Sequence, residues 1–183
     1  MDFAAHRFAE NGYHPTSVAE IVEGMGVGKG VFYWYFSSKE ELFLEILAEA
    51  QRNLRRRQQQ AIGHEPDPVR RIEVGIRATM EWLAGNRHVG SLFQFAASDE
   101  RFSPYLLRGQ DVAITDVARH VEEGIASGRI RGTDPVLLAH AILGVTNHLA
   151  RTFLLERDAP ADEVADEAIA FCLEGLLGSR VPA

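Results

Sequence analysis

Residues 16–42 read TSVAEIVEGMGVGKGVFYWYFSSKEEL, and this stretch decides the fold that we expect. Ser17 followed by Glu20 forms a capping box, the pattern that starts a helix. The turn Gly-Val-Gly at 26–28 follows that helix, and a second short helix covers about 29–36. Two helices joined by a short turn containing glycine form the unit that presents its second helix to the major groove of DNA.

A helix-turn-helix needs a small core beneath its two helices. Apolar residues at helical spacing predict that core: Val18, Ile21, Val22, Met25, Val27, Phe32 and Phe36. The run 31–36 holds too many rings for one short helix to bury, so some of them must face outward. Exposed aromatic side chains beside a lysine indicate contact with a partner. From the residues alone, an aromatic-rich hairpin buried in a core remains the alternative.

Several residues on the outward side of the second helix have the chemistry of DNA contact. Lys29 reaches a base edge or a phosphate, and tyrosine hydroxyls such as that of Tyr33 bond phosphate oxygens. Gly30 has no side chain, which lets the backbone approach the groove closely. Lys39 lies in the first turn of the next helix, where free backbone N–H groups also favour a phosphate.

The rest of the chain also reads as helices, because no stretch alternates apolar and polar residues long enough to predict a strand. Asp67-Pro68 and Asp134-Pro135 each combine a helix cap with a first-turn proline. The segment 64–68 is the clearest break in the chain. The expected helices span about 3–11, 18–25, 29–36, 38–62, 68–84, 88–97, 103–127, 134–157 and 162–178.

Composition limits the class of protein. The 183 residues are 46% hydrophobic, enough to bury a sizeable core. One cysteine, Cys172, leaves no internal disulfide, and we find no signal peptide and no apolar run of about 18 residues. We therefore expect a cytoplasmic protein with no membrane partner. The net charge of −7 argues weakly against a surface that binds nucleic acid all over, but it leaves room for a local basic surface.

Catalytic and metal-binding patterns are missing from residues 68–178 of the sequence. There is no phosphate-binding glycine loop, no nucleophile elbow and no pair of histidines at i, i+4. His140 and His148 lie eight residues apart, roughly 12 Å along a helix, too far to share an ion. Cys172 lies among apolar residues and is expected to be a small buried hydrophobe. We therefore expect no enzyme, no metal and no cofactor.

Residues 3–47 closely resemble the N-terminal motif of the TetR/AcrR family of transcriptional repressors. The resemblance implies an all-α homodimer, with a three-helix DNA-binding head at 1–48 and a ligand-binding and dimerisation domain at 49–183. The matching positions are Phe8 to Tyr13, Thr16 to Val18, Ile21, Gly26, Val27, Lys29, Gly30, Tyr33, Phe36 and Ser38 to Leu42.

By position, the resemblance also implies roles for individual residues of the head. Lys29, Tyr33 and Lys39 match residues that contact the phosphate backbone. A phosphate also lies near the cap of the first helix of the pair, which is Thr16 or Ser17. Direct reading of bases then falls to Gly30, Val31, Trp34 and Tyr35.

Two features depart from the family pattern. Gly28 stands where the family has a serine or threonine cap, so we expect a looser start to the recognition helix. The chain also begins late, and residues 1–36 hold only Arg7 and Lys29 against four acidic residues. A head with formal charge −2 is a poor electrostatic match for DNA. We therefore expect the first helix to be truncated, with the native start upstream of Met1.

A ligand pocket is expected in the C-terminal domain, because several rings fall on successive helices and ligand cavities are mostly apolar with a few polar groups. Each residue alone fits an ordinary core equally well, and the resemblance is what turns the set into a predicted pocket. Its members are Trp82, His88, Phe93, Gln94, Phe102, Tyr105, Asn147 and His148.

The last two helices are apolar on more than one face, so each has both its own domain and a second subunit to pack against. Two subunits would also place two heads on half-sites roughly 34–36 Å apart. The predicted interface residues are Leu137, Ala141, Gly144, Val145, Ala168, Phe171, Cys172 and Gly175.

These features together predict a repressor that is released from a double-stranded DNA operator by a small, largely apolar effector. The helix that begins after Ser38 connects head to body and is the expected lever. Two alternatives stay open at this point. One is a helical enzyme or small-molecule carrier whose hairpin is only structural, and the other is a regulator controlled by a protein partner.

Overall fold

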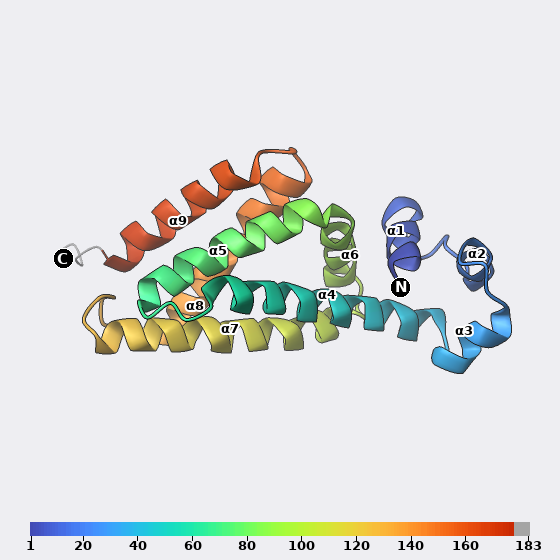
Figure 1. Cartoon of the computed structure of the whole chain (residues 1–183), viewed down its shortest axis with the longest axis horizontal. Coiled ribbons are helices and arrows are strands. Elements are labelled where there is room, and N and C mark those ends of the chain that lie inside the picture. The colour runs from blue at the N-terminus through green and yellow to red at the C-terminus, as the bar shows by residue number, and fades with distance from the viewer. Residues whose placement is uncertain (178–183) are drawn as a thin grey trace. The chain divides into compact units, whose positions relative to one another are not determined.

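Helices make up all the regular structure in the computed structural model, which describes residues 1–177 (Figure 1). The all-α prediction is thereby confirmed. No helix in this described part is both long enough and apolar enough to cross a membrane. The elements are α1 (Asp2–Asn11), α2 (Val18–Gly24), α3 (Lys29–Tyr35), α4 (Lys39–Ile62), α5 (Pro68–Gly85), α6 (Arg87–Ser98), α7 (Ser103–Ala126), α8 (Pro135–Leu149), η1 (Ala150–Leu155) and α9 (Ala161–Leu177).

Side-chain caps start three of these helices, and those of α5 and α8 are the ones that the sequence predicts. The Asp67 carboxylate accepts a bond of 2.9 Å from the Val69 amide ahead of α5. At the start of α8, Asp134 accepts a bond of 2.8 Å from the amide of residue 136. Ser38 accepts from the Glu41 amide at 3.1 Å, while the Glu41 carboxylate accepts from the amide of the preceding serine at 2.6 Å. Each bond satisfies an amide that the helix itself leaves free.

One predicted helix has a different course. The segment expected to run as a single helix over 134–157 is α-helical only to Leu149 and then winds as the π-helix η1. Ala150 and Leu154 of η1 are both buried. The chain leaves η1 through Asp158, whose φ of +56° is a conformation that aspartate tolerates better than most residues. Residue 178, the end of the last predicted helix, lies outside the described residues.

The chain divides into two compact units. The first contains residues 1–53 and 86–107, and the second contains residues 54–85 and those from 108 onward. In the first unit, α1 packs against α6, and α2 against α3. Its core includes the buried rings of Phe8, Tyr13, Phe32, Phe43 and Phe102. The predicted division between residues 48 and 49 stays a prediction.

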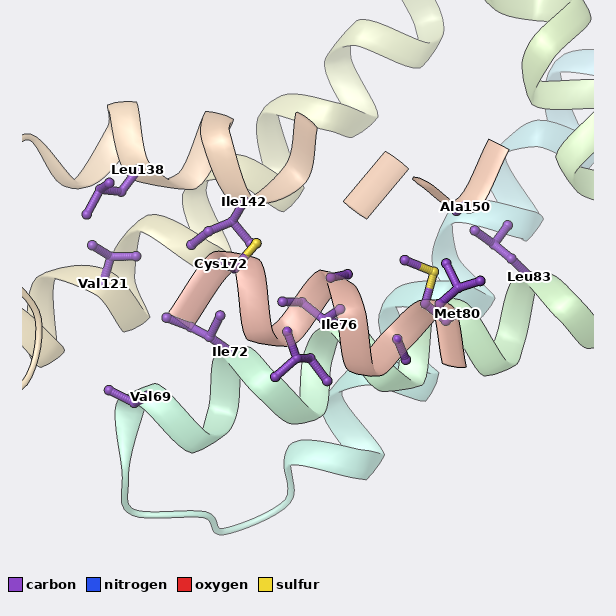
Figure 2. Close-up of a cluster of buried hydrophobic side chains, with 14 of the residues drawn as sticks. Val69, Ile72, Ile76, Met80, Leu83, Val121, Leu138, Ile142, Ala150 and Cys172 are labelled. Carbon is purple, nitrogen blue, oxygen red and sulfur yellow. The ribbon is translucent and has the colours of Figure 1, made fainter. Parts of the chain in front are cut away.

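In the second unit, α5 packs along α9, and both also contact η1. Figure 2 shows the buried cluster, to which α5 contributes Ile72, Ile76 and Met80. Met80 has no exposed surface, and Cys172 of α9 lies in the same cluster. Burying such apolar side chains is the main stabilising contribution to a unit of this size.

Candidate nucleic-acid interface

The turn between α2 and α3 fixes how the second helix is presented. Gly26 adopts a φ of +65°, a left-handed conformation that favours glycine. The Val27 amide donates to the carbonyl oxygen of Val22 at 3.0 Å and closes the end of α2. Phe32 points into the core of the first unit, where it is 6% exposed. The predicted helix-turn-helix is therefore present.

Six residues of α3 are exposed: Lys29, Gly30, Val31, Tyr33, Trp34 and Tyr35. Their exposed fraction reaches 78% at Trp34. The outward orientation predicted for them is confirmed, because the helix turns its one fully enclosed ring inward and carries the rest on its remaining sides. Their contact with DNA stays a prediction.

Met25 is a correction to the predicted core. It is 44% exposed, because α2 already ends at Gly24 and Met25 lies in the turn. The cap residue of α3 is Gly28, the residue that departs from the family's serine or threonine, and it makes no side-chain hydrogen bond to the helix.

Lys39 makes contacts that its sequence position did not reveal. Its ammonium group donates to the carbonyl oxygens of Tyr13 at 2.8 Å, His14 at 3.3 Å and Thr16 at 2.8 Å. It also lies 4.4 Å from the centre of the Tyr13 ring. Burial lowers the pKa of Lys39 below its usual range. Because an ammonium group has three donors, these carbonyl oxygens leave none for a phosphate.

The two predicted cap residues have different environments. Ser17 accepts a bond of 3.1 Å from the Glu20 amide, so it is the cap of α2, and it is exposed. Thr16 has no exposed surface, and its hydroxyl donates to the Gly12 carbonyl oxygen at 2.8 Å. We therefore remove the Thr16 side chain from the phosphate contacts and keep Ser17.

Arg7, one of the two basic residues in 1–36, is paired within the first unit. Its guanidinium donates to the Glu20 carboxylate at 3.0 Å from Nε, and it also lies 3.4 Å from a Glu10 oxygen. The hydrogen bond from Arg7 lowers the pKa of Glu20. Lys29 is exposed on α3 and is the other basic residue of this segment. The positive charge near α3 is therefore small.

The aromatic core of the first unit includes residues that we had predicted to line a ligand pocket. The Phe102 ring centre lies 4.6 Å from that of Phe43 and 5.0 Å from that of Tyr13. Phe102 has no exposed surface, so its assignment to a ligand pocket is corrected. The physical reason is that α6 packs against α1 and that residues up to 107 belong to the first unit, which the helical pattern of α6 alone does not reveal.

The other predicted ligand residues fall in both units. His88, Phe93, Gln94 and Tyr105 belong to the first unit, whereas Trp82, Asn147 and His148 belong to the second. The His88 ring stacks on that of His6 with centres 3.9 Å apart. Trp82 packs against the buried cluster of the second unit, and Asn147 and His148 are exposed. The structure does not bring the set together in one unit, and the ligand role of these seven residues stays a prediction.

A cleft of about 540 Å³ on the second unit lies between α7 and α8. This volume is within the range of small-molecule sites. Sequence reasoning missed it, because it depends on the approach of two helices. Its lining is mixed, and it consists of Asp111, Ile114, Thr115, Ala118, Arg119 and Glu122 of α7 with Pro135, Val136 and His140 of α8.

The predicted dimer residues divide by exposure. Leu137 is 62% exposed and Phe171 is 67% exposed, and Val145 is half-buried. Three small residues are also exposed, namely Ala141, Gly144 and Gly175. Ala168 and Cys172 are buried in the second unit's own cluster, so they are corrected from interface to core. Burial raises the pKa of the Cys172 thiol to about 11, which leaves it protonated and unreactive at neutral pH.

Comparison with known proteins identifies related chains. Residues 1–46 match the family model described as bacterial regulatory proteins, tetR family. The fatty acid metabolism regulator protein of Bacillus subtilis (strain 168) is 26% identical over 171 residues, which cover 90% of this chain and 86% of the relative. The HTH-type transcriptional repressor KstR2 of Rhodococcus jostii (strain RHA1) is 26% identical over 182 residues, which cover 96% of this chain and 88% of the relative.

A solved structure has the same fold. It is the crystal structure of the transcriptional regulator FadR from Bacillus subtilis in complex with stearoyl-CoA. The match covers 96% of this chain and 96% of the FadR chain, with a TM-score of 0.86. The two sequences are 22% identical, so this likeness is one of fold.

Proposed function

We propose that the chain, whose residues 1–46 match the tetR family model, is a repressor of that family whose α3 enters the major groove of an operator. The observation that carries the proposal is the outward face of α3. Phe32 anchors the helix, while Trp34 and Tyr35 expose 78% and 63% of their surfaces. A monomeric fold rarely exposes so much contiguous aromatic surface unless a partner covers it.

The contacts fall into two groups. Lys29, Tyr33 and Ser17 bond phosphate oxygens and set the position of the head on the duplex. The exposed residues Gly30, Val31, Trp34 and Tyr35 face the base edges. Lys39 is left out of the phosphate contacts because carbonyl oxygens take all three of its donors.

For the effector, we propose a ligand with an apolar chain. The support comes from the relatives, one named for fatty acid metabolism and one solved with stearoyl-CoA. Trp82, which packs against the buried cluster of the second unit, is kept as a candidate contact for such a chain. The cleft between α7 and α8, with Arg119 and His140 in its lining, offers charged and polar groups for a headgroup.

Coupling between effector and operator would run through α4. Residues 39–53 of this helix belong to the first unit and residues 54–62 to the second, so a change of helix position in one unit reaches the other along the chain. The effector shifts the balance of two states only as far as its affinities for those states differ.

A homodimer completes the proposal, with exposed Leu137 and Phe171 at the subunit contact. Two copies of α3 would then reach half-sites about one DNA turn apart, roughly 34–36 Å. An operator selected by such a dimer is expected to be palindromic.

The proposal is tested by selection of duplexes from a random library with the full chain, followed by footprinting of the enriched sequence. We expect one palindromic sequence whose binding weakens with salt, with the shallow slope that few phosphate contacts give. Addition of stearoyl-CoA to the complex is expected to release the DNA. Selection of no specific sequence would overturn the proposed function, and a specific complex that acyl-CoA leaves intact would overturn the proposed effector class.

A further inference from the structure

The recognition helix has few of the side chains that read bases by hydrogen bonds. Arginine and lysine read guanine, asparagine and glutamine read adenine, and acidic residues read cytosine. Helix α3 reads KGVFYWY, and of these base-reading types it contains only Lys29. Apolar side chains recognise a different feature, the C5 methyl group of thymine.

Gly30 adds a second observation. Glycine inside a helix is unfavourable relative to alanine. A Cβ at Gly30 would meet no atom within 4 Å, so the chain's own packing does not require a glycine there. Gly24 is the contrast, because a Cβ at that position would collide with the Phe3 ring. A partner that approaches the helix closely would account for the missing side chain of Gly30.

Helical spacing places Gly30 on the side of α3 opposite the buried Phe32. Val31, adjacent to it, is 49% exposed, and Trp34, one turn later, is 78% exposed. The Gly30 backbone flanked by these two apolar side chains makes a shallow apolar surface. We call Gly30, Val31 and Trp34 the reading surface.

The negative charge of the first unit makes contacts with the bases more important for affinity. Its residues, 1–53 and 86–107, hold six basic against ten acidic side chains. Attraction to the phosphate backbone is correspondingly weak. Contacts with the bases must then supply a larger share of the affinity than in a basic head.

We propose that the reading surface recognises the C5 methyl groups of thymines in the operator half-site. This inference rests on the proposed function and adds to it the chemical feature that is read. Thymine methyls project into the major groove, and a methyl group fits against Gly30 and Val31 without any polar group to satisfy. The operator is therefore expected to have thymines at the positions that α3 covers.

The test replaces thymines of the selected operator with deoxyuridine, one position at a time. Uracil pairs with adenine as thymine does and lacks only the methyl group. Removal of each contacted methyl group is expected to weaken operator binding by the full chain about three- to fivefold. An operator bound equally well with uracil at every position would overturn the inference while leaving the proposed function intact.

Val31→Ala links the effect to the reading surface. The variant is expected to lose its discrimination between thymine and uracil at one position of each half-site, so that the ratio of affinities falls to about one. A ratio that stays unchanged at every thymine would overturn the role of the reading surface. Selection of a guanine at those positions, with binding lost in Lys29→Ala, would show that Lys29 reads the site instead.

Gly30→Ala gives a test with effects of opposite sign. The added methyl is expected to raise the melting temperature of the chain, because alanine favours the helix, yet to weaken operator binding at least tenfold. Gly75→Ala is the matched control inside α5, where a Cβ makes only an ordinary contact of 3.9 Å with Ile62. This control should leave binding unchanged. Equal operator binding by Gly30→Ala and the native chain would overturn the close approach.

Discussion

At the scale of single residues, the chain's two lysines have different environments. Lys39 is held by three backbone carbonyl oxygens of the segment that precedes α2, whereas Lys29 is exposed on α3. Hydrogen bonds to a charged group contribute about 1.5–3 kcal/mol when buried, and less where water reaches them. A lysine that fixes a loop and a lysine that binds a phosphate therefore give different results when each is neutralised.

Lys39→Gln is expected to lower the free energy of unfolding by about 1–2 kcal/mol, because the carbonyl oxygens of Tyr13 and Thr16 lose their ammonium donor. The slope of log affinity against log salt should stay unchanged. Lys29→Gln should leave stability unchanged and reduce that slope by about 1. Denaturant unfolding and DNA titrations at several salt concentrations make the comparison. A slope reduced equally by both variants would return Lys39 to the phosphate contacts.

The outward residues of α3 were predictable because one buried ring and a period of 3.6 residues determine where the others point. The role of Lys39 was not predictable. Its partners are carbonyl oxygens, which have no sequence signature, and they converge only because the chain turns at Gly12 with a φ of +85°. The burial of Thr16 has the same origin.

At the scale of elements, His120 links α7 to α5. Arg71 of α5 lies with its guanidinium 3.2 Å from Nδ1 of His120 and also bonds the Glu123 carboxylate. Because a guanidinium only donates, Nδ1 must be the acceptor, and the ring is neutral. Burial is the main cause that lowers the pKa of His120, and the positive charges of Arg71 and Arg119 lower it further. The carboxylates of Glu123 and Asp116 raise this pKa, but by less.

The resulting pH dependence has a definite sign. The folded state holds a proton on His120 less tightly than the unfolded state, whose histidine has a pKa of about 6.5. Stability should therefore be full above pH 6.5, fall as the pH drops below it, and level off below the folded pKa. His120→Asn, which keeps an acceptor but does not titrate, should flatten this decline in thermal unfolding between pH 7 and 5. The exposed His140→Asn is the control, and an equal flattening there would contradict the assignment.

Gly124 gives a second prediction at this scale. At the end of α7 its carbonyl oxygen accepts from the amides of Arg129 and Ile130, at 2.9 and 3.0 Å, and the Ile130 side chain folds back over it. A Cβ at Gly124 would lie 2.8 Å from Cγ1 of the buried Ile130. Gly124→Ala is expected to lower the free energy of unfolding by about 1–3 kcal/mol, as measured in urea. Gly124→Ala combined with Ile130→Ala should lose less than the sum of the two changes.

Helix starts were predictable wherever a side chain caps them, as Asp67 and Asp134 do. The change from α8 to η1 was not predictable, because the spacing of apolar residues over 142–155 fits either winding. The place of α6 in the first unit was also hidden. Its buried side matches the rings of Tyr13 and Phe43, which lie far away in the sequence.

At the scale of the whole molecule, the division into units changes where an effector is to be sought. The sequence grouped residues 82–106 with 147–148 into one pocket, but residues 86–107 pack with the head. Local periodicity shows that a helix has an apolar face and does not show which element covers it. Trp82 and the cleft between α7 and α8 remain in the second unit as places for a ligand.

The apolar surface of α8 and α9 leads to the last prediction, on assembly. Phe171 is 67% exposed and Leu137 is 62% exposed, so neither contributes much to the stability of its own unit. Their burial against a second subunit would remove that apolar surface from water. Phe171→Glu should therefore leave the fold intact, as seen by circular dichroism, and weaken the dimer at least about a hundredfold, since it places a carboxylate in an apolar contact.

Sedimentation velocity over a range of concentrations measures this change directly. Val112→Glu is the matched control, an exposed apolar residue of α7 outside the predicted contact, with 41% of its surface exposed. It should sediment as the native chain does. One head alone reads half an operator. The Phe171→Glu variant should therefore bind a single half-site with the affinity of the native chain, and it should lose the preference for the full palindrome. A Phe171→Glu chain that stays dimeric would place the subunit contact elsewhere on the molecule.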